Sequence, residues 1–230
     1  MWWSVRSRFI HLALLDRARL RRIAVRYAEH GWEVVPGACL TGRRFVCDRD
    51  GCRTRACHPA LASWEKAASA DPAMVTAWWQ HQPHSLLLAT GRAFDVLEMP
   101  AYLGRRVLDA GMRIPHRSRG GTQVGRSYGP VAVTPAGRWM FLVRPGDPLR
   151  PELDQCYYVV RHGLGSWIPA PPTRLPEGPV RWVVSPELVQ WRLPDSYATQ
   201  HLLVDTLRSM SPANSPAGFP GQLPLPRRSR

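Results

Sequence analysis

The segment 86–100, LLLATGRAFDVLEMP, constrains the fold more than any other part of this chain. Two short apolar runs are joined by the turn-forming residues 90–92, which predicts a pair of strands. The second run carries two acids, Asp95 and Glu98. An acid in a hydrophobic strand is costly to bury unless it is paired or binds a metal. The residues alone favour a structural and a functional acid about equally.

Basic residues dominate the charge of the chain, which has 230 residues and a formal net charge of +14. It contains 31 lysines and arginines, and Lys66 is the only lysine. Arginine suits bidentate phosphate recognition, so nucleic acid is the leading candidate partner. The alternative is codon bias, because Arg, Ala and Pro rise together in GC-rich genomes. The length and the 44% hydrophobic content allow one sizeable core, or a core with a small appended module.

Neither a membrane nor a secretion pathway is indicated. No run approaches the roughly 20 apolar residues that a membrane span requires. The apolar patch 9–15 contains His11 and precedes charged residues without a small-residue cleavage site. The cysteines are five, an odd number that argues against a disulfide framework. We therefore expect a cytoplasmic protein.

Periodicity and turn residues predict interleaved helices and strands, with no internal repeat. The resulting expectation is an α/β (α+β) domain with a mixed sheet over residues 16–209, after an N-terminal extension 1–15 and before a disordered basic tail 210–230. Helices are expected at 16–30 with Asp16 as N-cap, from Asp71-Pro72 onward, at 100–111 and at 194–209. Strands are expected at 32–35, 86–90, 94–99, 130–134, 138–143, 157–161, 166–169 and 180–184.

The loop 38–59 has no periodicity and carries four of the cysteines. Thiolates and imidazole are the ligands that zinc prefers, and four of them close a tetrahedral structural site. We expect Cys47, Cys52 and Cys57 to bind one zinc ion together with either Cys39 or His58, since adjacent Cys57 and His58 do not easily bind the same ion. The alternative is a set of unligated surface cysteines. Cys156 lies far away in the sequence and is expected to be a buried small hydrophobe.

Several motifs in order resemble a known family. These are GWEVVPG, a Cys-rich loop ending in CHP, DPAMVTAWWQHQP, LLLATGRAFDVLEMP and GSWIPAPPTRLPEGPVRWV. Between about residues 24 and 207 the chain resembles the N-terminal domain of bifunctional DNA primase/polymerases, in the archaeo-eukaryotic primase superfamily. The resemblance implies a primase/polymerase-like fold in two parts, built around an RRM-like sheet with flanking helices. It also implies template-directed nucleotidyl transfer in DNA replication, with DNA, nucleoside triphosphates and a helicase or other replication protein as partners.

In active members of that family, two acids one residue apart on a strand bind magnesium or manganese ions. A histidine on the following hairpin and a third acid before a Pro-Pro motif complete the nucleotide site. Here Asp95 fits the first acid, but Leu97 stands where the second is expected and Glu98 comes one residue later. Residues i and i+3 of a strand point to opposite faces, so Asp95 and Glu98 could share a metal only across a bulge or a strand end.

Two further positions depart from the family pattern. The hairpin 134–141 contains no histidine, and residues 159–161 contain no acid. The sequence therefore predicts a retained polymerase fold with an eroded catalytic set. A second hypothesis is a non-catalytic, zinc-containing module that binds DNA or a protein partner. A third is an unrelated protein that is basic only through codon bias.

The polar, glycine-rich loop 113–128 is the expected DNA contact. Its side chains could follow a phosphate backbone without disturbing a core. The terminal arginines Arg227, Arg228 and Arg230 are weaker candidates, because a charged disordered end is usually just solvated. The expected DNA-binding residues are Arg113, Arg117, Arg119 and Arg126.

Overall fold

The structure, a computed structural model, describes residues 3–113 and 128–210, with side chains from residue 16 onward. The helices are α1 (Trp3–Glu29), α2 (Trp64–Ala67), α3 (Pro72–Trp78), α4 (Ala101–Arg113), α5 (Pro151–Asp154), the 3-10 helix η1 (Glu187–Val189) and α6 (Ser196–Met210). The strands are β1 (Val34–Gly37), β2 (Cys39–Thr41), β3 (Arg44–Val46), β4 (Ser85–Ala89), β5 (Asp95–Pro100), β6 (Val131–Val133), β7 (Arg138–Val143), β8 (Val160–His162), β9 (Trp167–Pro169), β10 (Arg174–Leu175), β11 (Gly178–Pro179) and β12 (Arg181–Val184).

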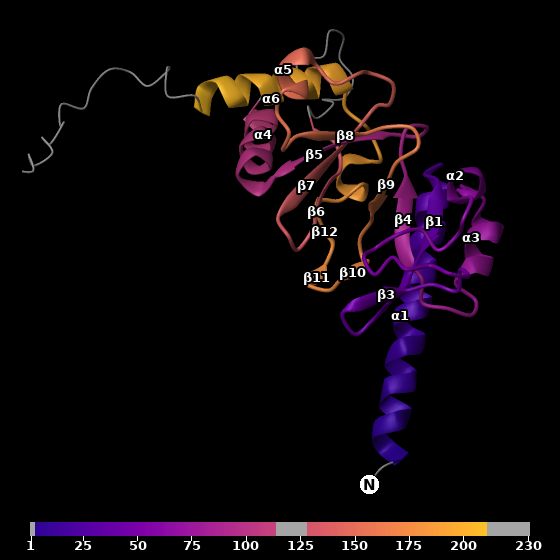
Figure 1. The fold of residues 1–230 in the computed structure, drawn as a ribbon. Coiled ribbons are helices and arrows are strands. Elements are labelled where there is room, and N and C mark those ends of the chain that lie inside the picture. The colour runs from indigo at the N-terminus through magenta and orange to yellow at the C-terminus, as the bar shows by residue number, and fades with distance from the viewer. Residues whose placement is uncertain (1–2, 114–127, 211–230) are drawn as a thin grey trace, which may run out of the picture.

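Two sheets organise the molecule, which is a mixed α/β fold (Figure 1). The five-stranded sheet has the order β12-β6-β7-β5-β8, and the three-stranded sheet has the order β1-β4-β9. β2–β3 and β10–β11 form separate two-stranded hairpins. A mixed sheet was expected, but every strand pair in the described residues is antiparallel.

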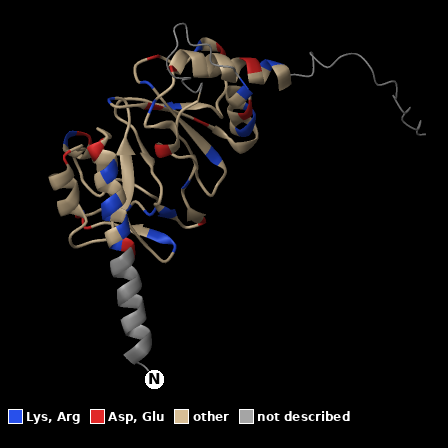
Figure 2. Ribbon diagram, turned by 180° about the vertical axis from the view of Figure 1, so that it is seen from behind, with Lys and Arg blue, Asp and Glu red and all other residues tan. Residues whose placement is uncertain are grey.

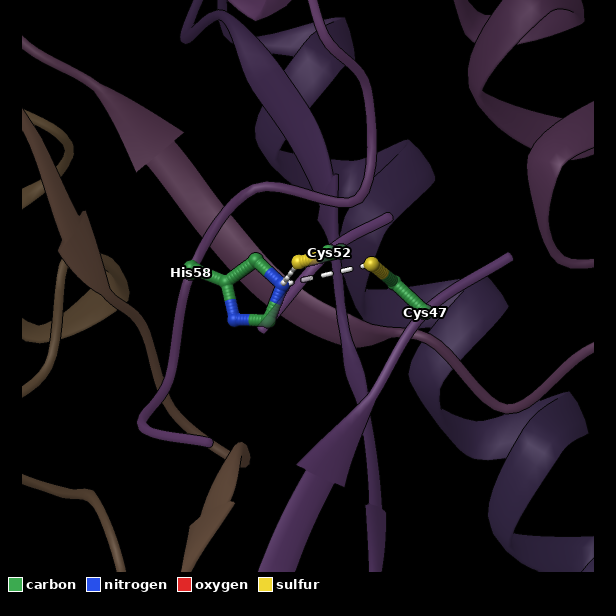
Figure 3. A group of neighbouring side chains, drawn as sticks. All are labelled: Cys47, Cys52 and His58. Carbon is green, nitrogen blue, oxygen red and sulfur yellow. Dashed lines mark hydrogen bonds between the residues drawn. The ribbon is translucent and has the colours of Figure 1, made fainter. Parts of the chain in front are cut away.

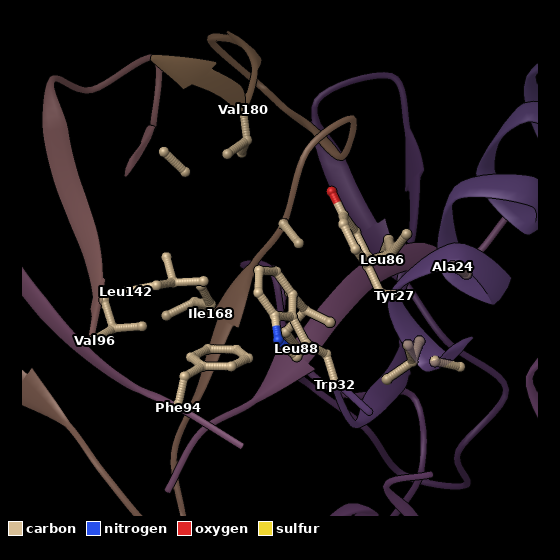
Figure 4. Close-up of a cluster of buried hydrophobic side chains, with 14 of the residues drawn as sticks. Ala24, Tyr27, Trp32, Leu86, Leu88, Phe94, Val96, Leu142, Ile168 and Val180 are labelled. Atoms are coloured by element: carbon tan, nitrogen blue, oxygen red, sulfur yellow. The ribbon is translucent and has the colours of Figure 1, made fainter. Parts of the chain in front are cut away.

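One hydrophobic cluster joins the two sheets to α1 (Figure 4). Leu88 of β4 and Val96 of β5 are fully buried in it, although their strands belong to different sheets. Tyr27 and Trp32 stack at a ring separation of 5.6 Å and bring the end of α1 into the same cluster. This shared core fixes how the two sheets lie against each other.

A second cluster covers the other face of the five-stranded sheet, where α4 and α6 pack. Leu97 and Met99 of β5 are fully buried there. Gly104 of α4 allows this close packing, because a Cβ atom at this position would lie 2.7 Å from the Trp139 Cβ atom on β7. The inner strand β5 is therefore covered on both faces.

Local sequence signals predicted several element boundaries correctly. Asp71 caps α3 by accepting a hydrogen bond from the Ala73 amide at 2.9 Å, with Pro72 at the first helical position. Gly31 follows the end of α1 with a φ of 75°. The predicted cap at Asp16 is wrong, because α1 already begins at Trp3 and Asp16 lies within it. The basic tail expected after residue 210 lies outside the described residues.

The strands on either side of the two short turns at 90–92 and 163–166 do not pair with each other. β4 belongs to the three-stranded sheet and β5 to the five-stranded sheet. Likewise, β9 belongs to the three-stranded sheet and β8 to the five-stranded sheet. The two turns instead connect the sheets. Within the described residues, no helix has the length and hydrophobicity to span a lipid bilayer.

Candidate functional site

The two acids of β5 point to opposite faces of the five-stranded sheet. Asp95 shares its face with Leu97, which packs in the cluster beneath α4 and α6. Glu98 shares the other face with Val96, which packs in the cluster that joins the sheets. The register of β5 against β7 runs without a shift from Asp95–Val143 to Pro100–Arg138. The described strand therefore has no bulge that would turn one acid towards the other.

Asp95 is fully buried and forms an ion pair with Arg161 of β8. Its Oδ2 atom accepts hydrogen bonds from Arg161 Nε at 3.1 Å and Nη2 at 2.7 Å, and from the Gly146 amide at 3.1 Å. Its Oδ1 atom is buried without a hydrogen-bond partner in the described residues. The guanidinium group thus occupies one side of the carboxylate and supplies its counter-charge.

Glu98 lies in a separate polar network on the opposite face. Arg138 donates from Nε to Oε1 at 2.6 Å, and His162 Nε2 lies 2.8 Å from Oε2. The other ring nitrogen of His162 is 3.0 Å from Ser166 Oγ. Burial disfavours the Glu98 carboxylate, but its hydrogen bonds with His162 and Arg138 outweigh this effect and lower its pKa. Glu98 is an ionised acid whose two oxygens already have partners.

This arrangement does not fit the divalent ions that the resemblance implies. In two-metal sites, carboxylates converge on ions about 3.5–4 Å apart. Here Asp95 and Glu98 diverge, and each is paired with an arginine. No catalytic step through such ions can be derived from these residues.

The Cys-rich loop brings three ligand atoms together in one group, formed by Cys47, Cys52 and His58 (Figure 3). His58 Nε2 lies 3.3 Å from Cys47 Sγ and 3.4 Å from Cys52 Sγ, and all three ligand atoms lie within 4.8 Å of one another. His58 Nδ1 is 2.7 Å from the carbonyl oxygen of Ala56. A proton on Nδ1 leaves the Nε2 lone pair free for a metal, which is the usual arrangement at histidine ligands. The group could hold a metal ion.

Two of the expected zinc ligands lie outside this group. Cys57 packs beside Val35 and Leu87 in a small hydrophobic cluster, and its neighbour His58 takes the place in the group. The Cys39 thiol donates to Gln82 Oε1 at 3.5 Å, and burial raises its pKa to about 11. Cys156 is half-buried and packs against the cluster beneath α4 and α6.

Of the expected DNA-binding residues, the structure describes only one. Arg113 is exposed at the C-terminal end of α4. Arg117, Arg119 and Arg126 lie outside the described residues.

The sequence interpretation missed the three partners of the β5 acids: Arg138, Arg161 and His162. Arg161 lies in the segment 159–161, where the family pattern places the third acid. His162 falls between the expected strands 157–161 and 166–169, but it ends β8 and faces Glu98 across the strand pair. These contacts join residues 40 to 66 positions apart, so no local pattern reveals them.

The comparison with known families agrees with this fold and these motifs. The family described as "Bifunctional DNA primase/polymerase, N-terminal" matches residues 24–198, which is more than half of the chain. No curated protein matches the sequence. The match extends from the end of α1 into α6 and includes the Cys/His group, β5 and β8. The chain belongs to the family of bifunctional DNA primase/polymerase N-terminal domains.

Proposed function

We propose that this protein uses the primase/polymerase fold to bind DNA and does not catalyse efficient template-directed nucleotidyl transfer. The observation that carries the proposal is the ion pair between buried Asp95 and Arg161. A divalent ion at Asp95 would lie beside the guanidinium group and experience its positive charge. Asp95 is the only acid here that matches its expected family position, so its pairing removes the strongest candidate metal ligand.

Glu98 does not replace the missing second acid in this proposal. A metal ion shared with Asp95 would require one of the two side chains to cross the sheet. A metal ion at Glu98 alone would compete with Arg138 and His162 for both carboxylate oxygens. Loss of one ligand from a two-ion site removes charge stabilisation worth several kcal/mol, or about three orders of magnitude in rate.

The proposal includes a structural zinc ion at Cys47, Cys52 and His58, completed by one further ligand. Two thiolates and an imidazole match the ligand preference of zinc. Hydrogen bonds to the Thr54 backbone and to Cys47 lower the pKa of the Cys52 thiol, which favours the ligating thiolate. The ion would hold an otherwise irregular loop in place.

Primer extension and de novo primer synthesis test the proposal, with magnesium or manganese and both deoxy- and ribonucleoside triphosphates. We expect background incorporation by the wild type, Asp95→Ala and Glu98→Gln, while the wild type binds labelled DNA. Robust incorporation that Asp95→Ala abolishes would overturn the loss of catalysis. Absence of DNA binding would overturn the other half of the proposal.

A further inference from the structure

Residues 39–58, which we call the arginine loop, carry a dense group of basic side chains. The arginine loop contains five arginines and only two acids, Asp48 and Asp50. It includes the β2–β3 hairpin and the Cys47, Cys52 and His58 group. In Figures 1 and 2, this basic hairpin lies at the opposite end of the molecule from α4 and α6. Its arginines are Arg43, Arg44, Arg49, Arg53 and Arg55.

The hairpin geometry places several of these side chains on the surface. Gly42 adopts a φ of 63° in the tight turn, and Arg43 follows it at the tip. Along β3 the exposed Arg44 precedes the buried Phe45. The Phe45 amide donates to the carbonyl oxygen of Arg55 at 3.1 Å, so the return segment runs beside β3. Arg44 and Arg55 therefore come from neighbouring stretches of backbone.

These arginines differ from the paired arginines elsewhere in the molecule. Arg138 and Arg161 each bind an acid of β5. Among the described residues, no ion pair or side-chain hydrogen bond involves the exposed Arg43, Arg44, Arg53 or Arg55. Their charge is available to an anionic partner.

The base of the arginine loop is anchored to the core. The Ala38 amide donates to the His58 carbonyl at 2.8 Å, which closes the loop beside β1. The Asp48 carboxylate accepts a hydrogen bond from the Gln82 side chain. Together with the Cys47, Cys52 and His58 group, these contacts limit the freedom of the loop. A loop with an anchored backbone loses less entropy on binding than a free segment.

We propose that the arginine loop binds the phosphate backbone of DNA, with Arg43, Arg44, Arg53 and Arg55 as its contacts. The inference rests on the proposed DNA-binding function and assigns it to a surface other than the loop 113–128. Arginines at a hairpin tip can contact successive phosphates without reading bases, so the binding would be largely independent of sequence. Each phosphate contact contributes about 0.9 to the slope of log affinity against log salt concentration.

Fluorescence anisotropy with a labelled DNA duplex at several salt concentrations tests this assignment. The full chain is compared with the double variant Arg43→Gln/Arg44→Gln. The matched control is Arg105→Gln/Arg106→Gln, which removes two adjacent exposed arginines from α4. Circular dichroism and thermal unfolding verify that both variants fold. We expect the loop variant to bind severalfold more weakly, with a salt slope lower by about 1.8, and the α4 variant to match the wild type.

The other outcomes are distinct. A loss confined to the α4 variant would overturn the assignment and place DNA at the end of the molecule that carries Arg113. Equal binding by the wild type and both variants would also overturn it. Absence of DNA binding by the wild type would instead count against the proposed function itself.

Discussion

Arg161 on β8 donates two hydrogen bonds to one oxygen of the fully buried Asp95 on β5, at 2.7 and 3.1 Å. The side chain of Arg161 is 27% exposed, whereas that of Asp95 is 1% exposed. The arginine therefore reaches from the edge strand of the five-stranded sheet to neutralise an acid inside it. This pairing accounts for an acid in a hydrophobic strand without a metal ion.

Removal of Arg161 should destabilise the fold strongly. Arg161→Ala leaves the Asp95 carboxylate buried without its counter-charge, and we expect a loss of about 3 kcal/mol in the free energy of unfolding. Urea denaturation measures this loss of stability. Arg92→Ala is the control, because the Arg92–Glu33 pair lies at the surface and should contribute at most about 1 kcal/mol. Equal losses in the two variants would contradict a buried, charge-dependent role for Arg161.

Glu98 should make the stability depend on pH in the acid range. Its folded-state pKa lies below the ordinary value of 4.5, since hydrogen bonds with His162 and Arg138 outweigh the effect of burial. Its contribution is therefore complete above about pH 4.5 and is lost as the pH falls through the lower folded-state pKa. The stability difference between the wild type and Glu98→Gln should shrink over that range, as measured by denaturation at a series of pH values.

The control for this pH dependence is Glu65→Gln, at an exposed position on α2 without an ion pair in the described residues. The stability of each variant is compared with that of the wild type. If the two differences shrink equally as the pH falls, the effect does not come from the Glu98 network.

Sequence patterns predicted the local features well. Asp71-Pro72 predicted the start of α3, and strand periodicity predicted that Asp95 and Glu98 face opposite ways. The pairing of strands and side chains far apart in the sequence was harder to predict. The apolar runs of β4 and β5 are separated only by a short turn, yet each finds its partners in a different sheet. The partners of Asp95 and Glu98 depend on that topology, which explains why the sequence identified the acids but not the basic residues that neutralise them.

The Cys-rich loop shows the same limit. Composition indicated a metal-binding group, and adjacency predicted that Cys57 and His58 would not both join it. Side-chain packing decides between them, because Cys57 packs into the hydrophobic cluster with Val35 while the buried His58 turns towards Cys47 and Cys52. The directions of these two neighbouring side chains depend on tertiary contacts with β1 and β4, which the loop sequence does not contain.

Gly91 should tolerate no side chain. Its φ is 97°, and a Cβ atom would lie 2.2 Å from the Leu164 backbone nitrogen in the turn between β8 and β9. In Gly91→Ala, backbone strain of about 1–2 kcal/mol adds to this overlap, so thermal unfolding should show a large loss of stability. Gly165→Ala is the control, since Gly165 has a φ of 79° with nothing within 4 Å of its Cβ position. Equal effects would show that the two turns are not held in close contact.

The last prediction concerns the metal ion. Elemental analysis of the purified protein should find about one zinc ion per chain, and a strong chelator should lower the unfolding temperature, because metal binding contributes to folding. Cys52→Ser should lose the zinc, since Cys52 belongs to the group with Cys47 and His58. Cys57→Ser should retain the zinc. Cys156→Ser should also retain it, because Cys156 packs against the distant cluster beneath α4 and α6. Loss of zinc in Cys57→Ser would show that Cys57 is a ligand. An unchanged unfolding temperature after chelation would show that the ion has no structural role.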